Sequence, residues 1–236
     1  MKKTNVAVVE CFPKRGEPIK GLIEEFGKDF YAEIFRAHKG ELPDGSFDAY
    51  IYSGGIGTVF EKDKYPYLEK LEELARRISK LGKPLLGICL GHQIIAEAFG
   101  GKVDEAENLE VGFQRIRAVK KDFLLKDIPE KFHAFTYHWH YVSRLPPNFE
   151  TLAESKMCRI HAMRHKEKPI FGIQFHIEYD SGAAKEILDY LKDEISGESL
   201  DYKKLLEDTK LYSGEISGKI IRNFLETARN PGLKNQ

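Results

Sequence analysis

The stretch Pro84-Leu85-Leu86-Gly87-Ile88-Cys89-Leu90-Gly91-His92-Gln93 places one cysteine between two glycines, where an apolar strand runs directly into a helix. A side chain at so sharp a turn projects into solvent, and the backbone N–H after it points toward the same spot. Gly87 and Gly91 suit the turn, because a Cβ at either position could clash with the neighbouring strand or helix. The helix N-terminus behind Cys89 favours the thiolate, the form of cysteine that attacks carbon. A buried structural cysteine is the alternative interpretation.

Alternating strands and helices surround this stretch and predict an α/β fold. Apolar residues that recur at helical spacing indicate an amphipathic helix over residues 64–82, and a second helix follows Cys89 over residues 90–99. Short apolar runs predict strands at residues 5–11, 30–35, 48–52 and 85–88. Elements of this length and order imply a mainly parallel central sheet that is flanked by helices on both faces.

The second half of the chain has a different pattern of apolar and turn residues. Short strand-like runs, separated by turn residues such as Pro146-Pro147-Asn148, predict added strands at residues 132–137, 150–154, 158–163 and 170–175. From Asp180 onward the chain is expected to be helical. We therefore predict one α/β domain over residues 1–196, followed by a helical extension over residues 197–236 that packs on the same domain.

Two apolar stripes mark the helical part of the chain. One consists of Ala184, Ile187, Leu188, Leu191 and Ile195, and the other of Ile216, Ile220, Ile221, Phe224, Leu225 and Ala228. Burying each large apolar side chain contributes about 1.5–3 kcal/mol, so the second stripe must be covered. The first stripe offers it a neighbouring apolar surface. The alternative is a docking helix for another protein or for a second copy of this chain.

Composition excludes several classes of function. The sequence has 37 basic and 37 acidic residues, so no global charge favours nucleic acid or an anionic membrane. No apolar run approaches the length of about 18 residues that a membrane span needs, and the N-terminus does not resemble a signal peptide. Three widely spaced cysteines form neither a disulfide framework nor a paired metal motif. We expect a cytoplasmic protein.

A second chemical motif lies in Ile170-Phe171-Gly172-Ile173-Gln174-Phe175-His176-Ile177-Glu178, where an apolar strand is followed by a histidine and, two residues later, a glutamate. Residues two apart in an extended segment face the same way, so His176 and Glu178 can share one side. A carboxylate beside an imidazole fixes its tautomer and stabilises the imidazolium that forms when it takes a thiol proton. A surface pairing is the alternative for such a motif on its own.

A third element is the glycine-rich turn Ser53-Gly54-Gly55-Ile56-Gly57-Thr58, which follows a strand. It fails the dinucleotide-binding pattern because Phe60 stands where the last glycine should be, and no Gly-Lys-Ser/Thr follows. A tight loop with bare N–H groups could instead approach a developing oxyanion. A plain turn is the alternative.

Together these three elements resemble the class I (triad) glutamine amidotransferases. The segment Gly87–Gln93 resembles the nucleophile motif of that family, Gly172–Glu178 its His-x-Glu motif, and Ser53-Gly54-Gly55 its oxyanion strand. Within the family the chain is most similar to the amidotransferase part of GMP synthase and its stand-alone relatives. Residues Ala134–Val142 align with their Ser-His-x-Asp-x-Val stretch, but Tyr137 replaces the serine and His140 the aspartate.

The resemblance implies a role for each matching residue. Cys89 would attack the side-chain amide of glutamine, His176 would transfer the protons, and Glu178 would hold His176. Two N–H groups would form the oxyanion hole, and three further residues, partly through their backbone, would seat the substrate. The oxyanion residues are Gly55 and Leu90, and the substrate residues are Gln93, Tyr137 and His138.

Metal binding is a separate possibility that the sequence raises. His133, His138 and His140 cluster around Trp139, but no cysteine or carboxylate stands at ligand spacing from them. Alternate positions of a strand explain the pattern equally well. We therefore predict neither a metal ion nor a cofactor.

Three functions fit the sequence. The first is a glutaminase that hands ammonia to an acceptor; since the chain has no ATP-pyrophosphatase signature, a synthetase would be a separate polypeptide. The second is a stand-alone hydrolase of γ-glutamyl compounds that uses the same triad. The third is a non-enzymatic regulatory module on the same fold, against which the intact Cys89, His176 and Glu178 argue.

Overall fold

The computed structural model describes residues 3–25, 29–55, 57–198 and 200–230, and within them nine strands form one sheet. The strands are β1 (Thr4–Glu10), β2 (Phe30–Arg36), β3 (Ala49–Tyr52), β4 (Leu85–Ile88), β5 (Lys102–Ala118), β6 (Lys131–Arg144), β7 (Phe149–Glu154), β8 (Ala162–His165) and β9 (Ile170–Ile173). The helices are α1 (Gly16–Glu24), α2 (Tyr67–Lys80), α3 (Leu90–Ala98), α4 (Ser181–Tyr190), α5 (Lys192–Gly197), α6 (Tyr202–Asp208) and α7 (Gly214–Arg229), with short 3₁₀ turns at Ala37–Lys39 and Thr209–Leu211.

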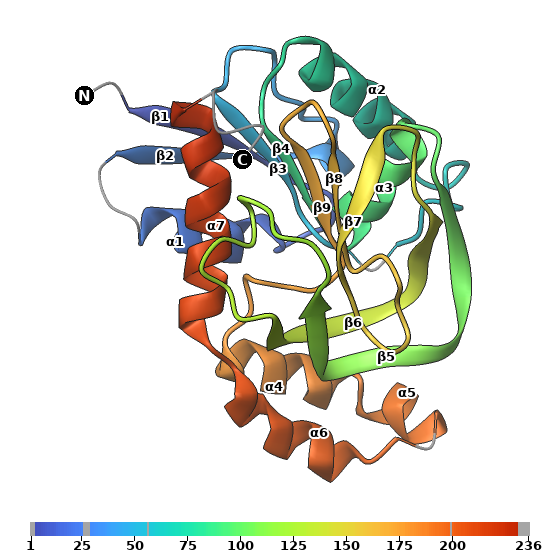
Figure 1. The fold of residues 1–236 in the computed structure, drawn as a ribbon. Coiled ribbons are helices and arrows are strands. Elements are labelled where there is room, and N and C mark those ends of the chain that lie inside the picture. The colour runs from blue at the N-terminus through green and yellow to red at the C-terminus, as the bar shows by residue number, and fades with distance from the viewer. Residues whose placement is uncertain (1–2, 26–28, 56, 199, 231–236) are drawn as a thin grey trace.

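The sheet has a parallel part and an antiparallel part. Its strand order is β2-β1-β3-β4-β9-β8-β7-β5-β6. The five strands from β2 to β9 in this order pair in parallel, and each later strand pairs antiparallel to the one before it. Figure 1 shows the long β5–β6 hairpin curving away from the parallel strands. The predicted α/β fold, with a parallel centre and added strands in the second half, is confirmed.

Alternate residues of the parallel strands bury their side chains on opposite faces of the sheet. Val6 and Val8 of β1 belong to a core cluster that includes residues of α1 and α7. Ala7 and Val9 belong to a second cluster, with α2 and α3. Strands that are buried on both faces have continuous apolar sequences, as the short strands β3 and β4 do. This arrangement explains why the first half of the chain has little alternation between polar and apolar residues.

The apolar stripe of α7 is covered within this chain. Four of its side chains are fully buried and lie in the same cluster as residues of α1 and of the parallel strands: Ile220, Ile221, Phe224 and Leu225. The surface that covers them is therefore not the stripe at residues 184–195, as the sequence suggested. That stripe instead packs in a third cluster with β5 and β6. The spacing of the apolar residues in α7 predicted that they are buried but could not identify the surface that covers them. The domain boundary at residue 196 stays a prediction.

Several predicted boundaries need correction. The strand expected at residues 158–163 begins only at Ala162, and Cys158 and Cys11 both lie outside strands. The run expected at residues 132–137 continues to Arg144, because β6 pairs along most of the length of β5. The sequence Asn230-Pro231-Gly232 predicts the end of a helix, and of these three residues only Asn230 is among those described. None of the described helices is both long enough and apolar enough to span a membrane.

Substituting Phe224 tests the packing of α7. Because its ring is fully buried against the sheet, Phe224→Ala should lower the free energy of unfolding by about 3–5 kcal/mol. Tyr31→Ala removes a ring that is half exposed on β2 and should change it by less than about 0.5 kcal/mol. Denaturant unfolding of both variants measures the difference. Equal, small effects would mean that α7 is not anchored in this core.

Candidate active site

Cys89 occupies a strained turn between β4 and α3. Its backbone has φ 50° and ψ −106°, a region that residues with a side chain rarely adopt. A Cβ on Gly87 would lie 2.4 Å from the backbone of Gly91, and one on Gly91 would lie 2.6 Å from the carbonyl oxygen of Tyr52. Only glycine permits so close an approach of strand and helix. The N–H of Cys89 donates to the carbonyl oxygen of Ile173 at 2.8 Å, which ties the turn to β9.

His176 lies beyond the end of β9 and is oriented by its neighbours. Its Nδ1 is 2.7 Å from Oε1 of Glu178, whose second oxygen accepts from the N–H of Ile177 at 3.0 Å. The ring of Tyr179 stacks on the imidazole with 4.8 Å between ring centroids. A Cβ on Gly54 would lie 2.9 Å from Cε1 of His176, so this glycine lets the loop after β3 reach the ring. With Nδ1 turned to the carboxylate, Nε2 is left for a reacting group.

The electrostatic setting of His176 favours its protonated form. Burial alone would lower the pKa of the imidazole, but the charges of Glu178 and Cys89 beside it outweigh burial and raise this pKa to about 10. The imidazole is therefore protonated at neutral pH. A protonated histidine near a thiol can hold an ion pair and later give a proton to a leaving group.

The sulfur of Cys89 also has one polar neighbour, Gln174, that the sequence did not predict. The Nε2 amide of the buried Gln174 lies 3.6 Å from Sγ, in position to donate to a thiolate. Nε2 of Gln93 in turn donates to Oε1 of Gln174 at 3.2 Å and to the carbonyl oxygen of His140 at 2.8 Å. On the other side, the carbonyl oxygen of Tyr137 lies 3.8 Å from Sγ. Gln174 stands two residues before His176, and this spacing was the only signal in the sequence.

Two cavities meet at Cys89. The smaller, of about 90 Å³, is lined by all five residues that were predicted to bind substrate or oxyanion: Gly55, Leu90, Gln93, Tyr137 and His138. The larger, of about 400 Å³, is lined by Cys89 and His176 together with Arg15, Tyr179 and other side chains. The Nη1 of Arg15 donates to the hydroxyl of Tyr179 at 2.8 Å. The structure therefore gathers the predicted residues around one thiol, and adds Arg15 and Tyr179.

The other cysteines have different surroundings. Both Cys11 and Cys158 are buried, and burial raises the pKa of each thiol, to about 12 for Cys11. They are therefore poor nucleophiles at neutral pH. The histidines on either side of Trp139 also separate: the ring of His140 packs against Phe60, with centroids 5.4 Å apart, whereas His138 contacts Glu110.

The arrangement has the parts that acyl transfer needs. A thiol stands at the N-terminus of α3, whose first backbone N–H groups have no partner within the helix. The N–H of Leu90 belongs to this turn, and Gly55 lines the same small cavity, where a Cβ on it would lie 2.9 Å from Cδ2 of Leu90. Such donors can stabilise an oxyanion that develops beside the thiol. His176, held by Glu178, can serve as the acid and base.

Comparisons with known proteins identify the family of the chain. The family model "Glutamine amidotransferase class-I" matches residues 22–193, well over half of the chain. A protein of Pyrococcus abyssi, named as one subunit of a glutamine-hydrolyzing GMP synthase, is 41% identical over 131 residues, which are 54% of this chain and 64% of that protein. The corresponding protein of Methanococcus aeolicus is 50% identical over 95 residues, 40% of this chain and 50% of that protein. The matches thus span less than two thirds of either relative.

Solved structures extend the similarity in fold over nearly the whole chain. The crystal structure of a glutamine amidotransferase from Thermotoga maritima matches with a TM-score of 0.84 and 23% identity, covering 98% of this chain and 100% of that one. A glutamine amidotransferase from Methylobacillus flagellatus matches with a TM-score of 0.80 and 18% identity, covering 95% of each chain. By its fold, and by the family match over residues 22–193, this chain belongs to the class-I glutamine amidotransferase family.

Proposed function

We propose that this protein hydrolyses the side-chain amide of glutamine to glutamate and ammonia, with Cys89 as the nucleophile. The observation that carries the proposal is the position of Cys89, on a strained turn where two cavities meet. The smaller cavity is lined by residues of the glycine-rich loop and by Gln93, and the larger cavity is lined by His176. Membership of the family supports the same reaction.

In the first half of the reaction, the Cys89 thiolate attacks the amide carbon of glutamine. The carbonyl oxygen takes up negative charge and is stabilised by the N–H groups of Gly55 and Leu90. The protonated His176 then gives its proton to the amide nitrogen, the carbon–nitrogen bond breaks, and ammonia leaves. The product on the protein is a γ-glutamyl thioester, and His176 is now neutral. Glu178 keeps the ring in the orientation that this transfer requires.

In the second half, water attacks the thioester. Neutral His176 takes a proton from the water as the new carbon–oxygen bond forms, and the carbon–sulfur bond then breaks. The thiolate of Cys89 and the protonated His176 are restored together, and glutamate leaves. The elevated pKa of His176, about 10, suits its role as the acid that protonates the leaving nitrogen.

We further propose that the ammonia passes to an acceptor on a separate polypeptide. The relatives from Pyrococcus abyssi and Methanococcus aeolicus are each named as one subunit of a glutamine-hydrolyzing GMP synthase. The sequence holds the nucleophile and His-x-Glu motifs that glutamine hydrolysis needs. A GMP synthase-like synthetase on another chain would supply the second half of such an enzyme.

Replacing the nucleophile tests the reaction. Cys89→Ala should abolish the release of ammonia and glutamate from glutamine, because no other thiol lines either cavity at the turn within the described residues. Purified variants are assayed alone and with a candidate synthetase, since a partner can assemble such a site. The matched control is Cys11→Ala, which removes a buried thiol and should lower stability rather than turnover. Wild-type turnover by Cys89→Ala would refute the proposal.

A second candidate function is supported by the unequal size of the two cavities. His176 protonates the leaving nitrogen, and it lines the larger cavity of about 400 Å³. Ammonia is similar in size to a water molecule, whose share of liquid volume is about 30 Å³, so it fills little of this space. Exposed Tyr190 and the charged Arg15 and Glu186 also line it. These features favour γ-glutamyl amides whose leaving amine is larger than ammonia.

The two candidates differ in their preferred leaving group. If the larger cavity accepts an amine, γ-glutamyl-p-nitroanilide should be hydrolysed with a kcat/KM at least equal to that for glutamine, measured by release of p-nitroaniline. Cys89→Ala should abolish both activities. Hydrolysis of glutamine with no release of p-nitroaniline would exclude the second candidate and leave the first intact.

A further inference from the structure

A buried cluster of side chains of metal-binding types lies on the antiparallel side of the sheet, next to the small cavity. The cluster consists of Glu110 on β5, His138 on β6, and Cys158 and His161 in the turn between β7 and β8. Their side chains are almost completely buried. Single ligand atoms of Glu110, Cys158 and His161 all lie within 4.8 Å of one another. Distant parts of the sequence thus bring a carboxylate, a thiol and two imidazoles together.

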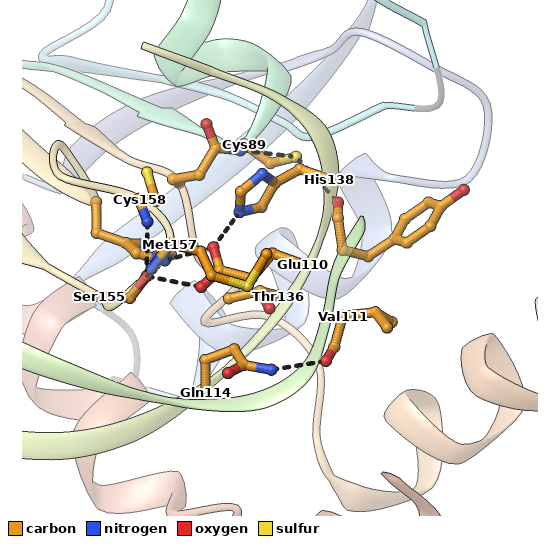
Figure 2. A network of polar contacts seen from close by, with 12 residues as sticks. Cys89, Glu110, Val111, Gln114, Thr136, His138, Ser155, Met157 and Cys158 are labelled. Carbon is orange, nitrogen blue, oxygen red and sulfur yellow. Dashed lines mark hydrogen bonds and ion pairs between the residues drawn. The ribbon is translucent and has the colours of Figure 1, made fainter. Parts of the chain in front are cut away.

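Both imidazoles converge on one carboxylate oxygen. Nε2 of His138 lies 2.8 Å from Oε2 of Glu110, and Nε2 of His161 lies 3.1 Å from the same atom. Figure 2 shows the ring of His138 pointing at this carboxylate, with Ser155 on the far side of it. The other oxygen, Oε1, accepts from the hydroxyl of Ser155 at 2.6 Å. The hydroxyl oxygen of Ser155 in turn accepts from the N–H groups of Met157 and Cys158.

This second layer of contacts resembles the outer shell of a metal site. Ligating carboxylates are commonly fixed by a hydrogen bond to the oxygen that does not face the metal. Ser155 makes that bond here and leaves Oε2 facing both imidazoles. The backbone bonds to Ser155 also fix the turn that carries Cys158.

Unpaired polar atoms in the cluster point to a missing ligand. His138 is 96% buried by its side chain, yet neither of its ring nitrogens makes an aligned hydrogen bond, despite the short approach to Glu110. A buried polar nitrogen without a partner is costly, and a cation bound at Nε2 of His138 is one way to satisfy that atom.

The surroundings supply a path for a cation. A cavity of about 360 Å³ reaches Glu110 and His138 from the surface. Glu105 and Glu107 line it as well, and the described residues around it include no lysine or arginine. The lining of the cavity that leads to the cluster is therefore acidic, with no positively charged side chain among its described residues. Such a charge distribution raises the local concentration of cations.

We propose that Glu110, Cys158 and His161 bind a zinc ion, with His138 as the fourth ligand. One thiolate, two imidazoles and one carboxylate form a ligand set typical of tetrahedral Zn²⁺, with bonds of about 2.0–2.3 Å. Ligand atoms in such a site stand about 3.3–3.8 Å apart, so the two imidazoles would move outward from Oε2, from which they lie 2.8 and 3.1 Å, to admit the ion. The thiolate and the carboxylate balance the two positive charges of the ion.

A zinc ion at this place would also fix part of the candidate active site. His138 directly follows Tyr137, whose carbonyl oxygen lies 3.8 Å from Sγ of Cys89. Both residues line the small cavity. Holding His138 between β5 and the β7–β8 turn therefore holds this wall of the cavity. The ion would act as a structural element and take no part in the reaction.

Metal content and a thiolate-specific spectrum test the proposal. The full chain is prepared with Cys89→Ser, so that the catalytic thiol cannot bind metal, then loaded with zinc and freed of excess metal by gel filtration. We expect one zinc ion per chain, measured by elemental mass spectrometry of the protein. Cobalt loading should give a thiolate-to-metal charge-transfer band. Cys158→Ser in the same background should abolish this band and weaken zinc binding at least tenfold in competition with a chromogenic chelator.

The matched control is Cys11→Ser in the same background, which removes another fully buried thiol and should keep both zinc and the cobalt band. If the folded Cys89→Ser protein, which is the parent of these variants, retains no stoichiometric zinc, the proposal is overturned. A cobalt complex of the parent without the thiolate band would also overturn it, a measurement that does not depend on whether the Cys158 variant folds. Neither result bears on hydrolysis by Cys89, because the assays measure no turnover.

Discussion

The contact between β4 and α3 on either side of Cys89 is the constraint on which the site depends. The backbones at Gly87 and Gly91 come so close that a single added carbon would overlap main-chain atoms. This approach forces the positive φ of Cys89 and turns its side chain out of the strand. The same turn places the N–H of Leu90 at the start of a helix, next to the sulfur. A relaxed turn would lose the nucleophile, the donor and the helix terminus together.

The parallel half of the sheet brings the other groups to this turn. β3, β4 and β9 are neighbours and point the same way, so the segments that follow them meet at one edge. Ligands in open α/β sheets bind outside the carboxyl ends of the strands for this reason. Here the edge gathers Gly54 after β3, Cys89 after β4 and His176 after β9. The antiparallel half contributes Tyr137, which also lines the small cavity.

The sequence predicted the features that short motifs encode. The strand–turn–helix at Cys89 and the pair His176 and Glu178 depend on neighbours within ten residues, which a pattern can reveal. Contacts between distant segments leave no such pattern. The buried set around Glu110 depends on a register shift in the β5–β6 pairing and on a turn far along the chain, so its members looked unrelated. The stripe on α7 predicted burial but not its partner, since spacing describes a face and not what covers it.

The most direct test of the account is to trap the intermediate on the protein. The wild-type chain is mixed with glutamine, quenched in acid during turnover, digested and analysed by mass spectrometry. If Cys89 is the nucleophile, the peptide that contains it gains the mass of one γ-glutamyl group, and loses it after treatment with hydroxylamine, which cleaves thioesters. Glutamine turnover that places the γ-glutamyl group on any other residue would contradict the account.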